Sequence, residues 1–194
     1  MSKKNRSDTK KKIVNAAWKL FYEQGYEDTT VEEIIELSQT SKGSFYHYFK
    51  SKDALLSSLS YIFDDKYIEL EGEVDPKMNS FDKLMYYNFE LFKMIENSVS
   101  LDLLAILYSS QLVTKGEKHL LDYNRVYYKV IRQTVIQGQE KGEIADDVTV
   151  NEVVKTYALC ERALIYDWCI CNGEYSLSKY SASMLPVFMA SYKK

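Results

Sequence analysis

The sequence predicts an all-α protein, in which a head of three short N-terminal helices is joined to a bundle of longer helices. Only two prolines and seven glycines interrupt the 194 residues. Apolar residues recur three and four positions apart, which is the spacing of one helix face, and no segment alternates like a strand. No apolar run approaches the roughly 20 residues that span a bilayer, and the lysine-rich N-terminus lacks the apolar core of a signal peptide. We therefore expect a cytoplasmic protein that does not insert into a membrane.

Charge is divided unevenly along the chain. The whole protein carries a net charge of -3, but residues 1–52 hold ten lysines and arginines against seven acidic residues, a net of +3. Positive charge attracts nucleic-acid phosphates, so this basic part is the one expected to bind nucleic acid. The first twelve residues contain six basic side chains and one acidic side chain, Asp8. They form either a phosphate-binding arm or a solvated tail. The basic residues are Lys3, Lys4, Arg6, Lys10, Lys11 and Lys12.

The first two helices have clear start and stop signals. One is predicted over residues 8–23, with Gly25 as its C-terminal stop. Thr30 and Glu33 have the spacing of a capping box, in which each side chain satisfies a backbone N–H that the helix start leaves free. This box predicts a second helix over residues 31–38.

The third helix is predicted over residues 42–49, after a polar turn at residues 38–41 whose side chains compete for backbone hydrogen bonds. Ser41 is placed to cap it. Phe45 and Phe49 are four residues apart and share one face, which can anchor the segment to a small core. This succession of helix, turn and helix is that of a helix-turn-helix, whose second helix enters a DNA groove.

The other side chains of the third helix are small, cationic or hydrogen-bonding aromatics, which suit phosphates and base edges in a major groove. Gly43 costs roughly 0.8 to 1 kcal/mol relative to alanine in a helix, so a close neighbour such as DNA is expected there. The alternative is an ordinary tyrosine-rich helical hairpin. The predicted DNA-contacting residues are Thr30, Ser41, Lys42, Gly43, Ser44, Tyr46, His47, Tyr48, Lys50 and Lys52.

The segment TSKGSFYHYFKSKDALL resembles the recognition helix and following linker of the TetR/AcrR family of bacterial regulators. Gln39 stands where that family has a turn glycine, so we expect a left-handed backbone there, which non-glycine residues resist. Thr40 stands where the family has valine. The matching positions are Ser41, Lys42, Gly43, Tyr46, Phe49, Ser51, Lys52 and Leu55.

This resemblance implies a DNA-binding domain at residues 1–52 and a helical ligand-binding and dimerisation domain at residues 53–194. It implies a homodimer that binds a pseudo-palindromic double-stranded DNA operator. The protein would be a repressor that a small-molecule effector releases from the DNA. The family also contains activators and members that do not respond to a ligand. Outside residues 9–56 the likeness is one of helix arrangement only.

Six further helices are predicted, over residues 52–70, 81–98, 101–113, 119–141, 149–172 and 177–192. Residues 72–80 are the clearest loop. Apolar residues run almost continuously through 101–113, so this helix is expected to be buried on most sides. Thr149 and Glu152 form a second capping box, and Pro186 is expected to kink the last helix or leave a carbonyl unpaired.

The last two helices are the best candidates for a surface that pairs two subunits, because they are rich in apolar residues and a two-fold interface must be self-complementary. The resemblance points to the same two helices, forming a four-helix bundle between subunits. The alternative is that these residues fill the core of a single chain. The predicted interface residues are Val153, Leu164, Ile165, Trp168, Leu185, Phe188 and Met189.

Thirteen of the seventeen tyrosines follow residue 60. Tyrosine combines an apolar ring with a hydroxyl that seeks a partner, which suits a pocket for a partly apolar small molecule. Glu161 interrupts an apolar stripe, where it forms an ion pair with Arg125 or Arg162 or serves as counter-ion to a cationic aromatic effector. The predicted pocket lining is Asn88, Phe89, Phe92, Leu104, Tyr108, Tyr123, Tyr127, Tyr157 and Glu161.

A ligand that fits this pocket only when the helix from residue 52 is shifted would favour a dimer whose heads no longer match the DNA repeat. The first alternative is an enzyme, but no catalytic residues, metal ligands or phosphate-binding loop stand out, and no cofactor is expected. The second is a ligand-binding or redox-sensing module without DNA binding. Cys160, Cys169 and Cys171 are expected to be free thiols, because an odd number in one helix does not form a disulfide framework.

Overall fold

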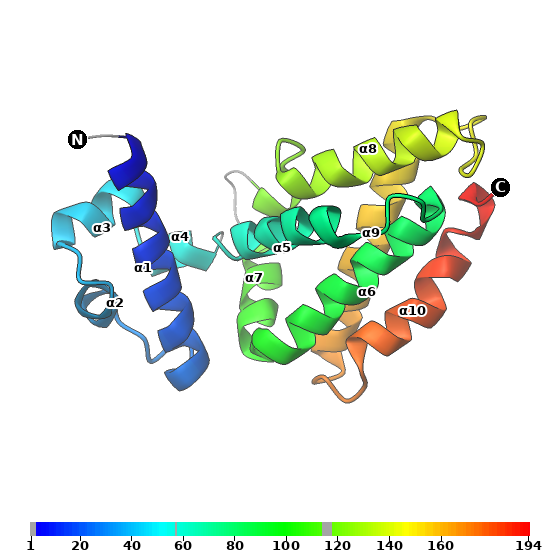
Figure 1. Ribbon diagram of the computed structural model, residues 1–194. Helices are drawn as coiled ribbons and strands as arrows, with labels where there is room; N and C mark the ends of the chain where they lie inside the picture. The colour runs from blue at the N-terminus through cyan, green and yellow to red at the C-terminus, as the bar shows by residue number, and fades with distance from the viewer. Residues whose placement is uncertain (1–2, 57, 114–117) are drawn as a thin grey trace.

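In the computed structural model, the regular structure of the described residues is helical, apart from one isolated β-bridge between Ile144 and Lys193 (Figure 1). The structure describes residues 3–56, 58–113 and 118–194, without the side chains of residues 3–7, 53 and 59. The side chains of Lys3, Lys4 and Arg6 in the predicted basic arm therefore lie outside the described residues. None of the described helices is long and apolar enough to cross a membrane.

The helices follow one another along the chain with short connections. The α-helices are α1 (Lys3–Gln24), α2 (Val31–Leu37), α3 (Lys42–Tyr48), α4 (Lys52–Leu56), α5 (Leu59–Glu73), α6 (Ser80–Ser98), α7 (Leu101–Val113), α8 (Val126–Glu140), α9 (Val150–Ile170) and α10 (Leu177–Phe188). Two short 3-10 helices are η1 (His119–Leu121) and η2 (Ala190–Tyr192). The predicted all-α fold class is confirmed.

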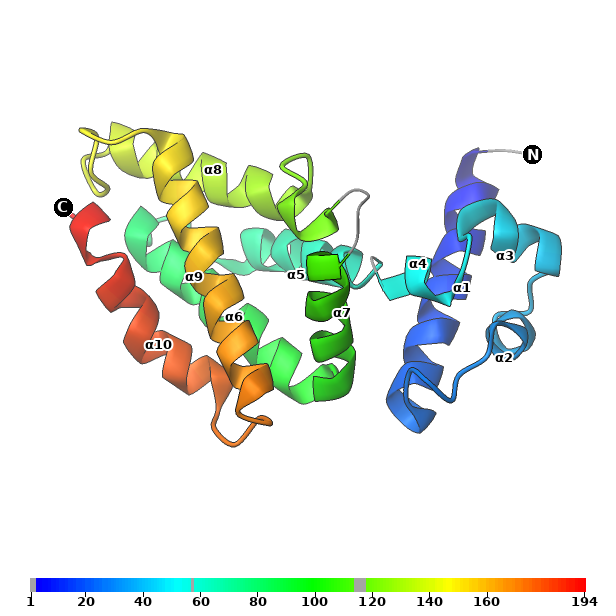
Figure 2. The same cartoon turned by 180° about the vertical axis from the view of Figure 1, so that it is seen from behind.

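The first three helices, α1 to α3, pack against one another as a head that stands apart from the bundle of α5 to α10 (Figures 1 and 2). α1 begins earlier than predicted, whereas α2 and α3 each end one residue before the predicted end. The head has a small apolar core in which the side chains are at most 1% exposed: Ile13, Ala17, Phe21, Ile34 and Phe45.

Local hydrogen bonds set the turns of the head. The Thr30 hydroxyl accepts the Glu33 amide at 3.2 Å and the Glu33 carboxylate accepts the Thr30 amide at 2.7 Å, so the capping box is confirmed. The Ser41 hydroxyl caps α3 by accepting the Ser44 amide at 3.1 Å. Gln39 has a φ of 52°, which confirms the predicted left-handed turn residue. Together these features fix the direction in which α3 leaves the turn.

The connection between the head and the bundle differs from the predicted single helix over residues 52–70. The chain forms α4 and α5 instead, with a turn between them in which the Ser58 amide and hydroxyl both donate to the Leu55 carbonyl. Serine side chains that compete for backbone carbonyls in this way interrupt helices. α5 then continues to Glu73, so the following loop begins two residues later than predicted, at Val74.

In the bundle, α6 packs against α5, α8 and α10, and α9 packs against α7, α8 and α10. α8 and α10 are clearly shorter than predicted, and α9 is shorter by three residues. α8 begins only at Val126, because the Asp122 carboxylate accepts the Asn124 amide at 2.9 Å and makes a turn before it. α10 ends at Phe188, two residues after Pro186, which has no N–H to continue the helix ladder.

α7 is less buried than its composition predicts. Leu103, Leu104 and Leu107 face the core, but Leu112 and Val113 at the end of the helix are 73% and 80% exposed. The prediction of burial on most sides is therefore wrong for this end. Its apolar residues form part of an accessible surface.

Candidate DNA-binding face and effector cavity

The outer side of α3 is the first candidate site. Phe45 and Phe49 are 0% and 5% exposed and anchor the helix to the head, as predicted. Lys42, Tyr46 and His47 of α3 are exposed. α3 lies at the outer edge of the head, away from the bundle (Figures 1 and 2). This side of the helix is therefore accessible to a DNA groove.

Two features leave the start of α3 open to an anion. The Lys42 ammonium lies 3.2 Å from the Glu32 carboxylate, and its hydrogen bond lowers the pKa of Glu32. Exposed ion pairs of this kind contribute little stability, so Lys42 can exchange Glu32 for a phosphate. A Cβ at Gly43 would meet nothing nearer than the Ser41 hydroxyl at 3.9 Å. The described structure therefore has room for a larger side chain at position 43, so packing within the protein does not explain the glycine.

Of the other predicted DNA-contacting residues, the exposed ones are Thr30, Ser41 and Lys50, and the half-buried ones are Ser44, Tyr48 and Lys52. Lys52 has partners inside the head. Its ammonium donates to the carbonyls of Tyr26 at 2.6 Å and Glu27 at 3.1 Å, and lies 4.3 Å from the centre of the Tyr26 ring. Lys52 thus fastens the turn after α1 to the start of α4, a role that the sequence prediction missed.

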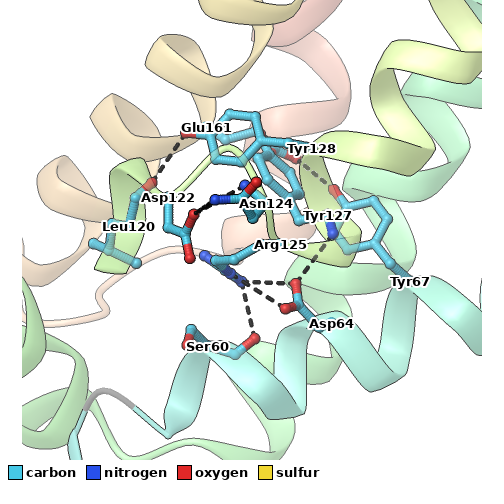
Figure 3. Close-up of polar contacts among 10 residues, drawn as sticks. All are labelled: Ser60, Asp64, Tyr67, Leu120, Asp122, Asn124, Arg125, Tyr127, Tyr128 and Glu161. Carbon is cyan, nitrogen blue, oxygen red and sulfur yellow. Dashed lines mark hydrogen bonds and ion pairs between the residues drawn. The ribbon is translucent and has the colours of Figure 1, made fainter. Parts of the chain in front are cut away.

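The second candidate site surrounds Glu161, which lies on α9 inside the bundle (Figure 3). Glu161 is 5% exposed, and neutral donors on three other helices hold its carboxylate. The Tyr127 hydroxyl donates to Oε2 at 2.7 Å. Tyr67 and Asn88 donate to Oε1 at 3.3 Å and 3.0 Å. This arrangement explains why Asn88 interrupts the apolar face of α6.

Burial governs the protonation of these groups. It raises the pKa of Glu161 above its ordinary value, although the hydrogen bonds from Asn88 and Tyr127 act in the opposite direction. Burial, followed by the charge of Glu161, raises the pKa of Tyr67 and Tyr127 well above the ordinary value of 10. Both hydroxyls therefore stay protonated and remain donors to the carboxyl group.

Neither of the predicted ion pairs of Glu161 is present among the described residues. Arg125 is paired with Asp64 instead, with Nη2 3.0 Å from Oδ1 and Nε 3.3 Å from Oδ2 (Figure 3). Arg162 donates to the Tyr128 hydroxyl at 3.3 Å. The ion-pair interpretation is therefore wrong, and Glu161 is a buried carboxyl group held by neutral donors.

A cavity of about 40 Å³ lies beside Glu161. It can hold water but is far below the roughly 300 Å³ at which small-molecule pockets begin. Of the predicted lining, Tyr108, Tyr127 and Glu161 border it. The sequence prediction missed Phe63 and Tyr67. These two aromatic residues are four positions apart on α5, a spacing that places them on one helix face and could have predicted them as lining residues. The bordering residues outside the predicted lining are Phe63, Tyr67, Leu91, Leu120, Arg125, Ala158, Arg162 and Ile165.

The predicted lining residues that do not border this cavity are Asn88, Phe89, Phe92, Leu104, Tyr123 and Tyr157. Tyr157 is fully buried, and its hydroxyl donates to the Leu84 carbonyl at 2.8 Å. Tyr123 is 57% exposed, and its ring centre lies 4.5 Å from that of Tyr128. The excess of tyrosine therefore serves the core and the surface as well as the cavity.

Two open grooves adjoin the cavity on the side of α7 and α9. Their volumes are about 300 and 240 Å³, and Tyr108 borders both of them as well as the cavity. Leu120 and Arg162 border the cavity and the larger groove. A movement of Tyr108 would therefore join the space beside Glu161 to a groove of the size that small molecules occupy.

Six of the seven predicted interface residues face the core of the single chain. Val153, Leu164, Ile165, Trp168, Leu185 and Met189 are at most 6% exposed, so their assignment to a subunit interface is wrong. Phe188 differs from these six because it is 46% exposed. Other exposed apolar residues on the same two helices are Leu159, Tyr166, Ile170, Tyr180 and Val187.

The three cysteines are free thiols, as predicted, and all three are half-buried. Burial raises the pKa of the Cys169 thiol to about 11 and also raises the pKa of Cys160. Both groups therefore favour the protonated thiol, which reacts more slowly than the thiolate. This protonation disfavours the redox-sensing alternative.

The N-terminal part of the chain matches a known family. Residues 13–59 match the profile described as bacterial regulatory proteins, tetR family. YuxN, an uncharacterized HTH-type transcriptional regulator of Bacillus subtilis, is 44% identical over 64 residues. The HTH-type transcriptional regulator QacR of Staphylococcus aureus is 42% identical over 60 residues. These alignments cover 32% and 31% of this chain, but only 22% and 32% of the two relatives.

A likeness over most of the chain is found with a solved structure. The crystal structure of Thermus thermophilus FadR, a TetR family transcriptional repressor in complex with lauroyl-CoA, has a TM-score of 0.76 and 18% sequence identity to this chain. The superposition covers 93% of each chain. The sequence likeness is thus strongest in the head, whereas the likeness in the bundle is one of fold.

Proposed function

We propose that this chain, whose residues 13–59 match the tetR family of bacterial regulatory proteins, is a transcription regulator whose DNA binding responds to a small molecule. The orientation of α3 is the main support. Phe45 and Phe49 are buried in the head, and Lys42, Tyr46 and His47 are left exposed. The family and the relatives are transcription regulators and not enzymes.

Residues 1–52 would bind the DNA, and residues 53–194 would bind the effector and a second subunit. One head reads few base pairs, so two heads related by a two-fold axis would bind the half-sites of a pseudo-palindromic operator. For subunit pairing we propose an apolar surface on the last two α-helices, called the α9–α10 face: Leu159, Tyr166, Ile170, Val187 and Phe188, all at least 46% exposed.

The effector would be a small, partly apolar molecule that enters beside Tyr108 and enlarges the cavity at Glu161. Glu161 is buried among neutral donors, and such a carboxylate favours a cationic group on the ligand as its counter-ion. Binding would shift the bundle relative to the heads and release the operator. The protein would then act in the cytoplasm as a repressor that its effector relieves.

A second class of effector is favoured by the composition of the larger groove. Lys118 and Arg162 border it, and its other lining residues are mostly apolar. A ligand with an apolar chain and an anionic head, such as the lauroyl-CoA bound by Thermus thermophilus FadR, would match these two features. The two classes differ in the sign of the charge that the protein would contact.

Selection of duplexes from a random pool, followed by titration of the preferred duplex, tests the DNA-binding proposal. Lys42→Ala and Tyr46→Ala should each weaken specific binding by roughly tenfold, and Lys42→Ala should reduce the slope of log K against log salt by about 1. Tyr22→Ala is the matched control, because Tyr22 is a 64% exposed tyrosine of α1. The proposal would be refuted if the selection enriched no duplex, or if Lys42→Ala and Tyr46→Ala bound the duplex as tightly as the control Tyr22→Ala.

A ligand titration separates the two effector classes. Tetraphenylphosphonium and lauroyl-CoA would each be added to the purified protein on its selected duplex. If tetraphenylphosphonium releases the wild type from the duplex but does not release Glu161→Gln, the first class is supported. Release by lauroyl-CoA that persists in Glu161→Gln and is lost in Arg162→Ala supports the second.

A further inference from the structure

The first turn of α5 is contacted by the head on one side. The Trp18 indole nitrogen on α1 donates to the Ser58 hydroxyl at 3.2 Å, just before α5 begins. The Lys10 ammonium, also on α1, lies 4.5 Å from the centre of the Tyr61 ring. Because α4 and α5 are separate helices, these side-chain contacts connect the head to the start of α5 without a continuous helix.

The same turn of α5 is held by the start of α8 on its other side (Figure 3). Arg125 donates to the Ser60 carbonyl at 2.9 Å and forms the ion pair with Asp64. The two side chains of this pair are only 9% and 8% exposed. A buried ion pair loses several kcal/mol when one partner is removed, so Asp64 and Arg125 are expected to move together.

Tyr127 is bonded both to this clamp and to the cavity carboxyl group. Its backbone N–H donates to Asp64 Oδ1 at 3.1 Å, and its hydroxyl donates to Glu161 Oε2 at 2.7 Å. Tyr127 also borders the cavity. The cavity holds about 40 Å³, so a ligand of ordinary size must displace part of its wall.

We propose that Tyr127 couples the occupancy of the Glu161 cavity to the DNA-binding head, acting through the Asp64–Arg125 pair and the first turn of α5. A ligand that takes the place of the Tyr127 hydroxyl at Glu161 moves the start of α8. The buried ion pair carries that movement to Ser60 and Asp64, and the contacts at Ser58 and Tyr61 carry it to α1. This regulation rests on the proposed function, because it requires a chain that binds DNA through α3.

A double-mutant cycle on DNA affinity tests the coupling without an identified effector. Tyr127→Phe removes the hydroxyl bond to Glu161 and leaves the backbone bond to Asp64. Asp64→Asn weakens the clamp. The affinity of the full chain for its selected duplex would be measured for the wild type, both single variants and the double variant. Interacting residues have non-additive effects, whereas independent ones multiply.

Tyr128→Phe is the matched control, because Tyr128 is the next residue on α8 and its hydroxyl donates to the Leu120 carbonyl at 3.0 Å. If Asp64→Asn does not fold, Asp64→Asn/Arg125→Gln takes its place in the cycle, because it removes both buried charges together. Helicity and thermal unfolding of each variant establish that it is folded.

We expect each single change to alter duplex affinity about threefold or more, and the double variant to differ from the product of the two effects by a similar factor. Tyr128→Phe should stay within about twofold of the wild type. Folded variants with wild-type affinity, or effects that multiply, would overturn the coupling. A wild-type chain that selects no duplex would instead overturn the proposed function.

Discussion

The Trp18 indole nitrogen lies 3.2 Å from the hydroxyl oxygen of Ser58, a hydrogen bond between residues 40 positions apart that joins the head to the start of the bundle. Ser58 is fully buried, and its hydroxyl donates in turn to the Leu55 carbonyl. The same serine thus interrupts the connecting helix and receives the head. Together with the contact of Lys10 with the Tyr61 ring, this bond holds the head against the start of α5.

Replacing Trp18 with phenylalanine should lower the free energy of unfolding by about 1 kcal/mol, because one partly buried hydrogen bond is lost and the Ser58 hydroxyl is left without this donor. Urea unfolding followed by circular dichroism measures the change. Tyr22→Phe is the control, since Tyr22 is 64% exposed on the same helix. An equal effect of the two substitutions would show that the bond to Ser58 does not stabilise the fold.

Gln39→Gly should raise the free energy of unfolding by roughly 0.5 to 1 kcal/mol. The φ of 52° at Gln39 is a left-handed conformation, which costs a residue with a Cβ about 1 to 2 kcal/mol, and the greater freedom of glycine in the unfolded chain offsets part of the gain. Gln39→Ala keeps the Cβ and should give no increase. If alanine stabilises as much as glycine, backbone strain is not the cause.

Glu161 should make the folded chain less stable as the pH rises. Burial raises the pKa of Glu161 in the folded state above the ordinary 4.5, so between these two values the folded chain binds more protons than the unfolded chain, and the free energy of unfolding falls with pH. Glu161→Gln removes this dependence. We expect the stability of the wild type minus that of Glu161→Gln to decrease above about pH 4.5, measured by urea unfolding.

Glu143 provides a control of opposite sign. Its carboxylate accepts the Ser80 amide at 2.7 Å, and hydrogen bonding to Ser80 lowers its pKa. Its stabilisation is therefore present above the unfolded pKa and is lost as the pH falls through the folded pKa. The difference between wild type and Glu143→Gln should increase with pH, so two differences of the same sign would contradict this assignment of charge states.

Ile170→Glu should dissociate the proposed dimer. Ile170 is 59% exposed on α9, so the single chain should still fold. Two-fold pairing would bury the new charge twice, and we expect a weakening of association by roughly tenfold or more. Sedimentation equilibrium measures the association constant. Ile68→Glu is the control, because Ile68 is 54% exposed on α5, and similar weakening by both variants would exclude the α9–α10 face.

The head was predictable from sequence because its signals are local. The capping pair Thr30 and Glu33 is three residues apart, Phe45 and Phe49 are four apart, and the turn residue Gln39 was compared with a known motif. Each of these features depends on backbone geometry within one or two helical turns. The structure confirms the capping box, the buried phenylalanines and the left-handed turn.

The bundle was less predictable because its decisive contacts are distant in sequence. The donors to Glu161 lie 94, 73 and 34 residues away, at Tyr67, Asn88 and Tyr127. α9 also has apolar residues on more than one side, so composition alone did not distinguish buried Leu164 from exposed Leu159. Only the packing of neighbouring helices decides which apolar side belongs to the core.

The burial of Val153, Leu164, Ile165 and Trp168 inside the single chain bears on how folding depends on protein concentration. These side chains are at most 6% exposed within one chain, so their burial does not require a second copy. Pairing in the proposed dimer would then follow mass action, whereas folding of the single chain would not depend on concentration. The level of gene expression would therefore set the fraction of paired chains in the proposed dimer without changing the stability of the single chain.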